Sequence, residues 1–187
     1  MKLFSKDKPI IFIDIDDTLA NTRQAVFDLY IEATGDGTGN IHAEDKQYVS
    51  FCPLWTDEEI GKLFYNGYVL YDRVQPMPMA QKAVVALEEK GYDVRIATLH
   101  TAHGIPAKQA WIDRHFPTLS NKVIYINDTL GNKDVLAEYA LIDDHYKNIK
   151  TNKSAMPILL DIYNIYRSMS KDSCIICKSW AEVMSKL

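Results

Sequence analysis

The feature that most constrains the fold is a short apolar run that stops at a group of carboxylates. Ile10 to Ile13 are followed by Asp14, Asp16 and Asp17. A continuous apolar segment of this length indicates a buried strand, most simply one in a parallel sheet. Ligand sites in open α/β sheets lie just beyond the carboxyl ends of such strands. The three acids are therefore expected where the chemistry of such a fold takes place.

Carboxylates this close together repel one another unless a cation or a shared proton compensates. One explanation is a bound hard cation together with one carboxylate that does covalent chemistry. The other is a solvated acidic turn, because Asp16-Asp17-Thr18 is also suitable turn chemistry. This segment alone leaves both explanations open.

From Pro78 onward, helical and strand patterns alternate at a regular spacing. Expected helices cover 80–90, 107–115, 133–138 and 179–187, and expected strands cover 93–98, 122–126, 139–143, 155–160 and 174–177. This alternation is typical of crossover units that build a parallel sheet. We therefore predict an α/β fold, with a Rossmann-like parallel sheet flanked by helices.

Residues 21–75 are too many for a single connection within a compact domain. They include a capping box at Thr56 to Glu59, which predicts the start of a helix. We predict a small, mainly helical cap domain at 21–75 that lies over the carboxyl ends of the strands. Residues 1–20 and 76–187 are then expected to form the core domain.

The composition argues against several classes of protein. A net charge of -4 gives no basic footprint for nucleic-acid binding. No apolar run is long enough to span a membrane, and the first residues lack the apolar region of a signal peptide, so a cytoplasmic location is expected. The three cysteines are too few for a disulfide framework. Cys174 and Cys177 have the spacing of a metal knuckle, but without a second pair they are expected to be residues of a late strand.

Polar residues stand at the ends of other expected elements. Thr98 ends one strand, Asp143 and Asp144 end another, and Lys133 begins a helix, where the N-terminus favours anions. Each residue alone has a plain structural explanation as a helix cap, a solvated side chain or a turn. Together, at one edge of one sheet, they form a much more specific set.

In this order the residues resemble the four motifs of the haloacid dehalogenase-like hydrolases, most of which are phosphatases. Within that superfamily the chain most resembles the 5'(3')-deoxyribonucleotidases, and the similarity runs nearly end to end. The segments that carry this second resemblance are Pro76-Met-Pro78, Lys108-Gln-Ala-Trp111, Leu141-Ile-Asp-Asp144 and Ser179-Trp-Ala181.

The resemblance implies a phosphatase that hydrolyses nucleoside monophosphates through an aspartyl-phosphate intermediate. Asp14 matches the nucleophile, and Asp16 matches the general acid/base. Thr98, Lys133 and Lys108 match the groups that hold the transferring phosphate. Covalent catalysis of this kind splits one difficult step into two easier ones.

The resemblance also implies a Mg²⁺ cofactor. The matching ligands are the carboxylates of Asp14 and Asp143 and the backbone carbonyl of Asp16, with Asp144 in support. Mg²⁺ suits such a site because it prefers oxygen ligands and binds one or two carboxylates.

The sequence departs from the family pattern at two positions. Asp17 stands where many relatives have glycine, and Leu99 stands where a small hydroxyl residue often follows the threonine. In the cap, Tyr65 and Tyr71 align with aromatic positions of the substrate pocket. Other aromatic side chains there, which could equally stack on a base or form the core of the cap, are Tyr48, Phe51, Trp55 and Phe64.

Three functions remain open at this point. The first is a nucleotidase with a small-molecule nucleotide substrate. The second is a phosphatase of the same mechanism that acts on a nucleic-acid 3'-phosphate end or on a non-nucleotide phosphomonoester. The third is a non-catalytic module that binds a phosphorylated ligand. No membrane contact and no stable nucleic-acid partner are expected, and a homodimer stays open.

Overall fold

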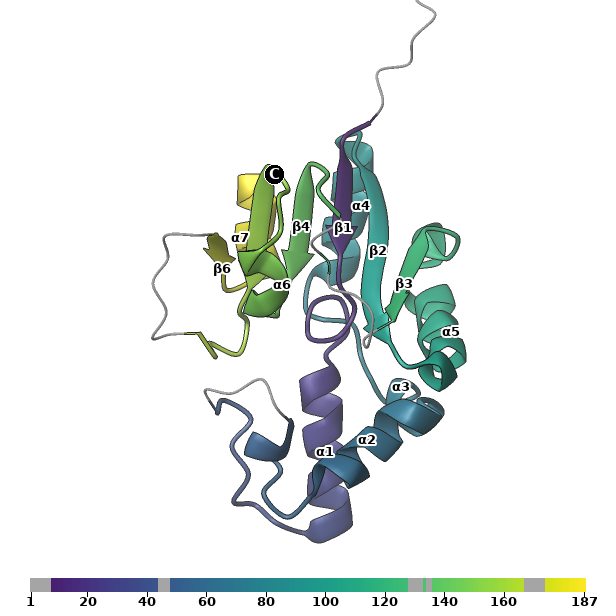
Figure 1. Ribbon diagram of the computed structural model, residues 1–187, viewed down its shortest axis with the longest axis vertical. Helices are drawn as coiled ribbons and strands as arrows, with labels where there is room; N and C mark the ends of the chain where they lie inside the picture. The colour runs from purple at the N-terminus through teal and green to yellow at the C-terminus, as the bar shows by residue number, and fades with distance from the viewer. Residues whose placement is uncertain (1–7, 44–47, 128–132, 134–135, 167–173) are drawn as a thin grey trace, which may run out of the picture.

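A six-stranded, fully parallel sheet forms the centre of the computed structural model, which describes residues 8–43, 48–127, 133, 136–166 and 174–187 (Figure 1). The strand order is β3-β2-β1-β4-β5-β6. The strands are β1 (Ile10–Ile13), β2 (Asp93–His100), β3 (Val123–Asn127), β4 (Ala140–Asp143), β5 (Met156–Leu160) and β6 (Ile175–Cys177). The predicted fold class, a Rossmann-like parallel sheet flanked by helices, is confirmed.

Strand β1 is apolar throughout because both of its faces are buried. Ile11 and Ile13 pack into the larger hydrophobic cluster, whereas Phe12 points into a smaller one on the opposite face. Ile13 pairs in register with Ile96 of β2 and with Ile142 of β4. Side chains of successive strand residues point to opposite faces, so a strand covered on both sides reads as a continuous apolar run.

Helices cover both faces of the sheet (Figure 1). Helices α4 (Ala80–Glu89) and α7 (Trp180–Lys186) contribute to the larger cluster, and α6 (Tyr146–Lys150) contributes to the smaller one. Helix α5 (Ile105–His115) lies at the β3 side of the sheet. No helix of the described residues is long and apolar enough to cross a membrane.

A second group of helices lies beyond the carboxyl ends of the strands (Figure 1). It consists of α1 (Thr22–Thr34), the 3-10 turn η1 (Tyr48–Ser50), α2 (Asp57–Asn66) and α3 (Tyr68–Tyr71), and we call it the helical segment. The capping box at the start of α2 is confirmed, since the side chains and backbone N–H groups of Thr56 and Glu59 bond reciprocally.

The helix expected over 133–138 is confirmed at Lys133, which lies in a 3-10 turn, and is wrong in its second half. Residues 134 and 135 lie outside the described part of the chain, and Leu136 to Glu138 are not helical. The carbonyl oxygens of Lys133 and Leu136 accept hydrogen bonds from the amide of Asn152, at 2.9 and 3.1 Å. The Lys133 carbonyl also accepts from the Leu136 N–H at 3.1 Å, as in a 3-10 turn, and the side chain of Asn152 caps this turn from a distant loop.

Candidate active site

The loop after β1 brings its acids to the carboxyl edge of the sheet. The backbone N–H of Asp14 donates to the carbonyl of Ile142 on β4, at 3.0 Å. The carbonyl of Ile15 then accepts from three backbone N–H groups, those of Thr18, Leu19 and Ala20. From the far end of the chain, the Trp180 indole donates to the Thr18 carbonyl at 3.0 Å. The loop is therefore tight and anchored from two directions.

The ammonium of Lys133 links two of the acids. Its Nζ lies 2.6 Å from Oδ1 of Asp14 and 2.6 Å from Oδ2 of Asp143. Only the second contact has hydrogen-bond geometry, so Oδ1 of Asp14 is a buried oxygen in an ion pair without a hydrogen bond. Lys133 is fully buried and Asp14 is 8% exposed, so little solvent screens these charges.

Asp143 is held by other donors as well. The backbone N–H of His145 donates to its Oδ1 at 2.7 Å, and the amide of Asn148 lies 3.1 to 3.2 Å from both oxygens. The adjacent Asp144 is also buried. Asp14, Asp143 and Asp144 each offer an oxygen within 4.8 Å of the others, which is the spacing of a potential metal site.

Burial and the charge of the ion-pair partner shift the pKa values of Asp14 and Lys133 in opposite directions. Burial raises the pKa of Asp14 to about 6, because the attraction of Lys133 is too weak to offset desolvation and the nearby carboxylates. Burial lowers the pKa of Lys133, but the attraction of Asp14 and Asp143 outweighs it and leaves the pKa raised. Lys133 therefore carries a positive charge at neutral pH.

The carboxylate of Asp16 is held by three donors. Oδ1 accepts from the hydroxyls of Thr22 at 2.8 Å and Tyr71 at 2.5 Å, and Oδ2 accepts from Nζ of Lys108 at 2.6 Å. Burial alone would raise the pKa of Asp16, but the ammonium of Lys108 and the two hydroxyls lower it. Lys108 also lies 3.1 Å from the hydroxyl of Thr98 and donates to the Leu99 carbonyl at 2.7 Å.

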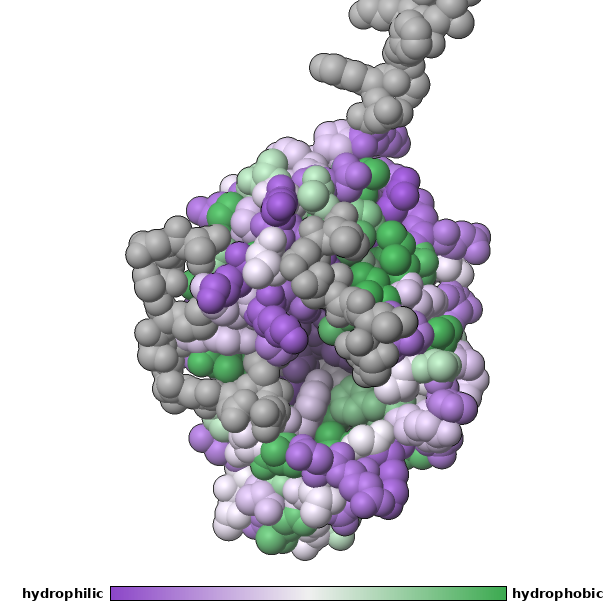
Figure 2. All heavy atoms as spheres, in the orientation of Figure 1, coloured by the Kyte–Doolittle hydropathy of each residue, from purple (hydrophilic) through white to green (hydrophobic). Residues whose placement is uncertain are grey.

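Two adjoining cavities open at this edge. The first, of about 250 Å³, is lined by Asp14, Asp16, Asp17, Tyr48, Phe64, Thr98, Leu99, Asp144, His145 and Asn148. The second, of about 170 Å³, shares Asp16, Phe64 and Leu99 with it and extends to Lys108 and His100. Figure 2 shows hydrophilic side chains gathered in the hollow between the sheet and the helical segment. The acids thus lie on the floor of a cleft with aromatic side chains in its wall.

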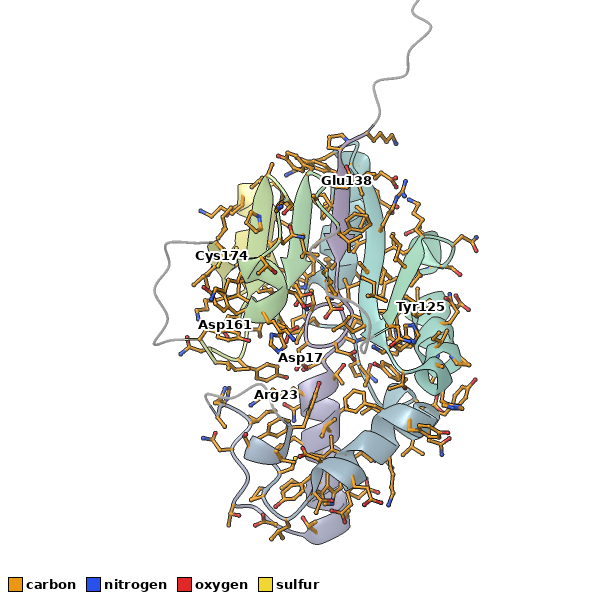
Figure 3. The ribbon with its side chains drawn as sticks, viewed as in Figure 1. Asp17, Arg23, Tyr125, Glu138, Asp161 and Cys174 are labelled. Carbon is orange, nitrogen blue, oxygen red and sulfur yellow. The ribbon has the colours of Figure 1, made fainter. Side chains whose placement is uncertain are left out.

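Asp17 takes the left-handed backbone conformation, with φ of 55°. Glycine adopts this conformation most easily, and aspartate is among the few other residues that tolerate it. The carboxylate is buried and accepts from the backbone N–H of Arg23 at 2.6 Å. Figure 3 shows Asp17 and Arg23 together at the start of α1, whereas Glu138 lies at the opposite end of the sheet.

Arg23 is fully buried and joins parts of the helical segment. Its Nε donates to the Ile41 carbonyl at 2.6 Å, and the guanidinium lies 4.0 Å from the centre of the Phe51 ring. Burial lowers the pKa of Arg23, and Asp17 opposes this effect. The extra acid at position 17 therefore lies against the start of α1.

Seven of the predicted site residues converge, namely Asp14, Asp16, Thr98, Lys108, Lys133, Asp143 and Asp144. Tyr65 lies apart, since its side chain is about half exposed and its ring packs on His103 with 4.3 Å between the centroids. Tyr71 is buried against Asp16 and lines neither cavity, and the aromatic side chains in the cavity wall are Tyr48 and Phe64.

Sequence reasoning missed three contacts of the site: those made by Thr22, Asn148 and the hydroxyl of Tyr71. The first two lie close in sequence to acids of the site, Thr22 as the first residue of α1 and Asn148 in the middle of the short helix α6, where a polar side chain could have been suspected. Tyr71 follows Asp16 by 55 residues, and no local pattern joins them.

A parallel α/β sheet with these acids and Thr98 at its carboxyl edge, and with Lys108 of α5 and Lys133 against them, defines a haloacid dehalogenase-like hydrolase. Solved structures agree at the level of the fold. A haloacid dehalogenase-superfamily hydrolase from Ehrlichia chaffeensis matches with a TM-score of 0.52 and 16% identity, over 97% of each chain. A protein described as a predicted phosphatase from Clostridium acetobutylicum matches with a TM-score of 0.61 and 9% identity, over 96% of this chain and 97% of that one. A hydrolase from Pseudomonas syringae matches with a TM-score of 0.57 and 16% identity over the same shares.

The particular family follows from a family model. Residues 8–187 match the family described as 5' nucleotidase, deoxy (pyrimidine), cytosolic type C, and the chain belongs to this family. Its class is therefore that of a phosphoric monoester hydrolase. A comparison with curated proteins found no match.

Proposed function

We propose that the protein hydrolyses deoxyribonucleoside monophosphates through a phosphorylated Asp14, in the cytoplasm, with Mg²⁺ as cofactor. The observation that carries the proposal is the contact of Lys133 with both Asp14 and Asp143 at 2.6 Å, at the floor of the cleft. A nucleophile, a fixed cation and a second acid at one point are the groups that phosphoryl transfer uses.

The acids fit a divalent cation in charge and in spacing. Three carboxylates and one ammonium leave a net charge of -2 on Asp14, Asp143, Asp144 and Lys133. Mg²⁺ binds oxygens at about 2.1 Å, so ligands on opposite sides are about 4.2 Å apart, close to the 4.8 Å limit of this cluster. When bound, Mg²⁺ would neutralise part of the repulsion between the carboxylates and a phosphate dianion.

Each side chain then has a defined task. Asp14 attacks phosphorus while the bond from phosphorus to the leaving oxygen breaks, and Asp16 gives that oxygen a proton. Asp16 then takes a proton from the water that attacks the aspartyl-phosphate, which frees Asp14 and inorganic phosphate. Lys133, Lys108 and the Thr98 hydroxyl hold the equatorial oxygens of the transferring group.

The helical segment supplies the substrate side of the site in this proposal. Residues 21–75 act as the cap domain, and 1–20 with 76–187 act as the core. Tyr48 and Phe64 line the larger cavity above the acids. Their rings offer flat apolar faces on which a base can stack, which favours a nucleotide over a small sugar phosphate.

A screen of phosphate release over nucleoside monophosphates, sugar phosphates and a 3'-phosphorylated oligonucleotide tests the proposal. We expect release from nucleoside monophosphates with Mg²⁺, and none from the Asp14→Asn variant. Release from sugar phosphates alone would refute the nucleotide part. A preference for the oligonucleotide that falls steeply with salt would indicate a polynucleotide substrate instead.

A further inference from the structure

Both ends of the helical segment reach the same oxygen of Asp16. Thr22 is the first residue of α1 and Tyr71 is the last residue of α3. Their hydroxyls donate to Oδ1 at 2.8 and 2.5 Å. From the core, Lys108 of α5 donates to Oδ2 at 2.6 Å. The carboxylate is thus held by the entry and the exit of the helical segment and by the core.

The three donors occupy most, but not all, of the hydrogen-bond acceptor positions of the Asp16 carboxylate. An ionised carboxylate has about four acceptor positions, two on each oxygen. Thr22 and Tyr71 fill both positions on Oδ1, and Lys108 fills one on Oδ2. Within the described part of the chain, the position that remains is on Oδ2. Since Asp16 lines both cavities, this oxygen is the one that can exchange a proton with a substrate.

The structure fixes Tyr71 closely against α5. Its side chain is 2% exposed, and its backbone N–H donates to the Gly67 carbonyl at 2.8 Å. Gly67 has a φ of 64°, and a Cβ at this position would lie 2.6 Å from Cβ of Ala107 on α5. Such close packing holds the hydroxyl of Tyr71 near Lys108, the residue that directly follows Ala107 on α5.

We propose that Tyr71 and Thr22 are positioning residues that act through Asp16. By filling Oδ1, they hold the carboxylate so that Oδ2 meets the leaving oxygen of the substrate. In the first step a bond forms from Asp14 to phosphorus and the bond from phosphorus to the leaving oxygen breaks, while Oδ2 of Asp16, which has first taken up a proton from solvent, gives that proton to the leaving oxygen. A carboxylate free to rotate would be correctly aligned for a smaller fraction of the time, and the step would slow. This inference rests on the acid/base role proposed for Asp16.

The test compares two esters that differ in their need for an acid. p-Nitrophenolate leaves without a proton, whereas the alkoxide of a nucleoside monophosphate or of glycerol phosphate needs one. The rate of the first step is measured by rapid quench for the wild type, Tyr71→Phe, Thr22→Val and the double variant. Tyr68→Phe is the matched control, because Tyr68 lies on the same short helix and is 51% exposed.

We expect Tyr71→Phe to lower the rate with the alkyl ester at least tenfold and the rate with the aryl ester much less, with little change in KM. Thr22→Val should show the same selectivity, and the double variant should lose less than the product of the two single losses, because both act on one oxygen. Tyr68→Phe should match the wild type. Equal losses for both esters would show a merely structural role, and no loss would show no role; either result overturns the inference.

If the proposed function itself is wrong, the same assays give a different pattern of rates. If the wild type hydrolyses neither ester, the acid/base role and this inference fall together. If Asp16→Asn shows the selective loss with the alkyl ester but Tyr71→Phe and Thr22→Val do not, the proposed function stands and only the positioning role is refuted.

Discussion

Replacing Asp14 with asparagine is expected to stabilise the metal-free protein while it ends turnover. Burial raises the pKa of Asp14 from 3.8 to about 6, although Lys133 lies only 2.6 Å away. At about 1.4 kcal/mol per pKa unit, carrying this charge in the folded state costs on the order of 3 kcal/mol near neutral pH. Asparagine keeps the size of the side chain and removes the charge, so the free energy of unfolding should rise by up to this amount.

The effect has a defined dependence on pH. The pKa of Asp14 in the folded state, about 6, lies above the ordinary value of 3.8 expected in the unfolded chain. The folded state therefore holds the proton more tightly, and the stability that this provides is fully present below pH 3.8 and lost as the pH rises through about 6. The difference between variant and wild type should be close to zero in acid and largest above the folded pKa.

Thermal unfolding in EDTA across this pH range measures the difference. For a protein of this size, about 1 kcal/mol corresponds to a change of about 2–4 °C in Tm. Asp28→Asn, which removes an exposed carboxylate, is the control and should show no such trend. A variant that melts well below the wild type near neutral pH, or a difference that does not depend on pH, would refute the reasoning about buried charge.

Three further predictions concern the Lys133 ion pairs, the cofactor and the helix cap at Thr56. Lys133→Met should lower the free energy of unfolding by about 3–5 kcal/mol, because Asp14 and Asp143 lose the counter-ion between them; chemical denaturation measures this, and a stability near that of the wild type would contradict the ion pairs. EDTA should stop phosphate release and Mg²⁺ should restore it; activity that persists in EDTA would exclude the cation. Thr56→Ala should lower Tm by about 2–4 °C, because the loss of a helix cap costs about 1 kcal/mol, with turnover unchanged; a variant with wild-type Tm would show that the capping box contributes nothing to stability.

The sequence predicts well those elements that are determined by residues close together in the chain. The apolar run of β1 marks a strand buried on both faces, and the side chains at Thr56 and Glu59 mark the start of α2. The order of acids, threonine and lysine along the chain predicts their convergence, because the carboxyl ends of parallel strands meet at one edge. The contacts of Lys133 with Asp14 and Asp143 agree with that expectation.

The remaining features depend on packing between distant segments. Leu136 to Glu138 do not form the expected helix, because Asn152 from a later loop satisfies the backbone there. The hydroxyl of Tyr71 meets Asp16 only because α3 packs on α5. Since neither partner lies within a few residues of the other, no periodic pattern in the sequence could have predicted these contacts.

The indole contacts make the protein suitable for optical measurement. Trp180 is buried and donates to the carbonyl of Thr18, in the loop that connects β1 to α1. Trp111 is buried as well and donates to the carbonyl of Val74, on the chain that leaves α3. Because indole emission responds to the polarity and hydrogen bonding around the ring, two of the three tryptophans report separately on two connections next to the cleft. Replacing Trp55 and one of these two with phenylalanine would leave a single tryptophan that reports on one connection without an attached dye.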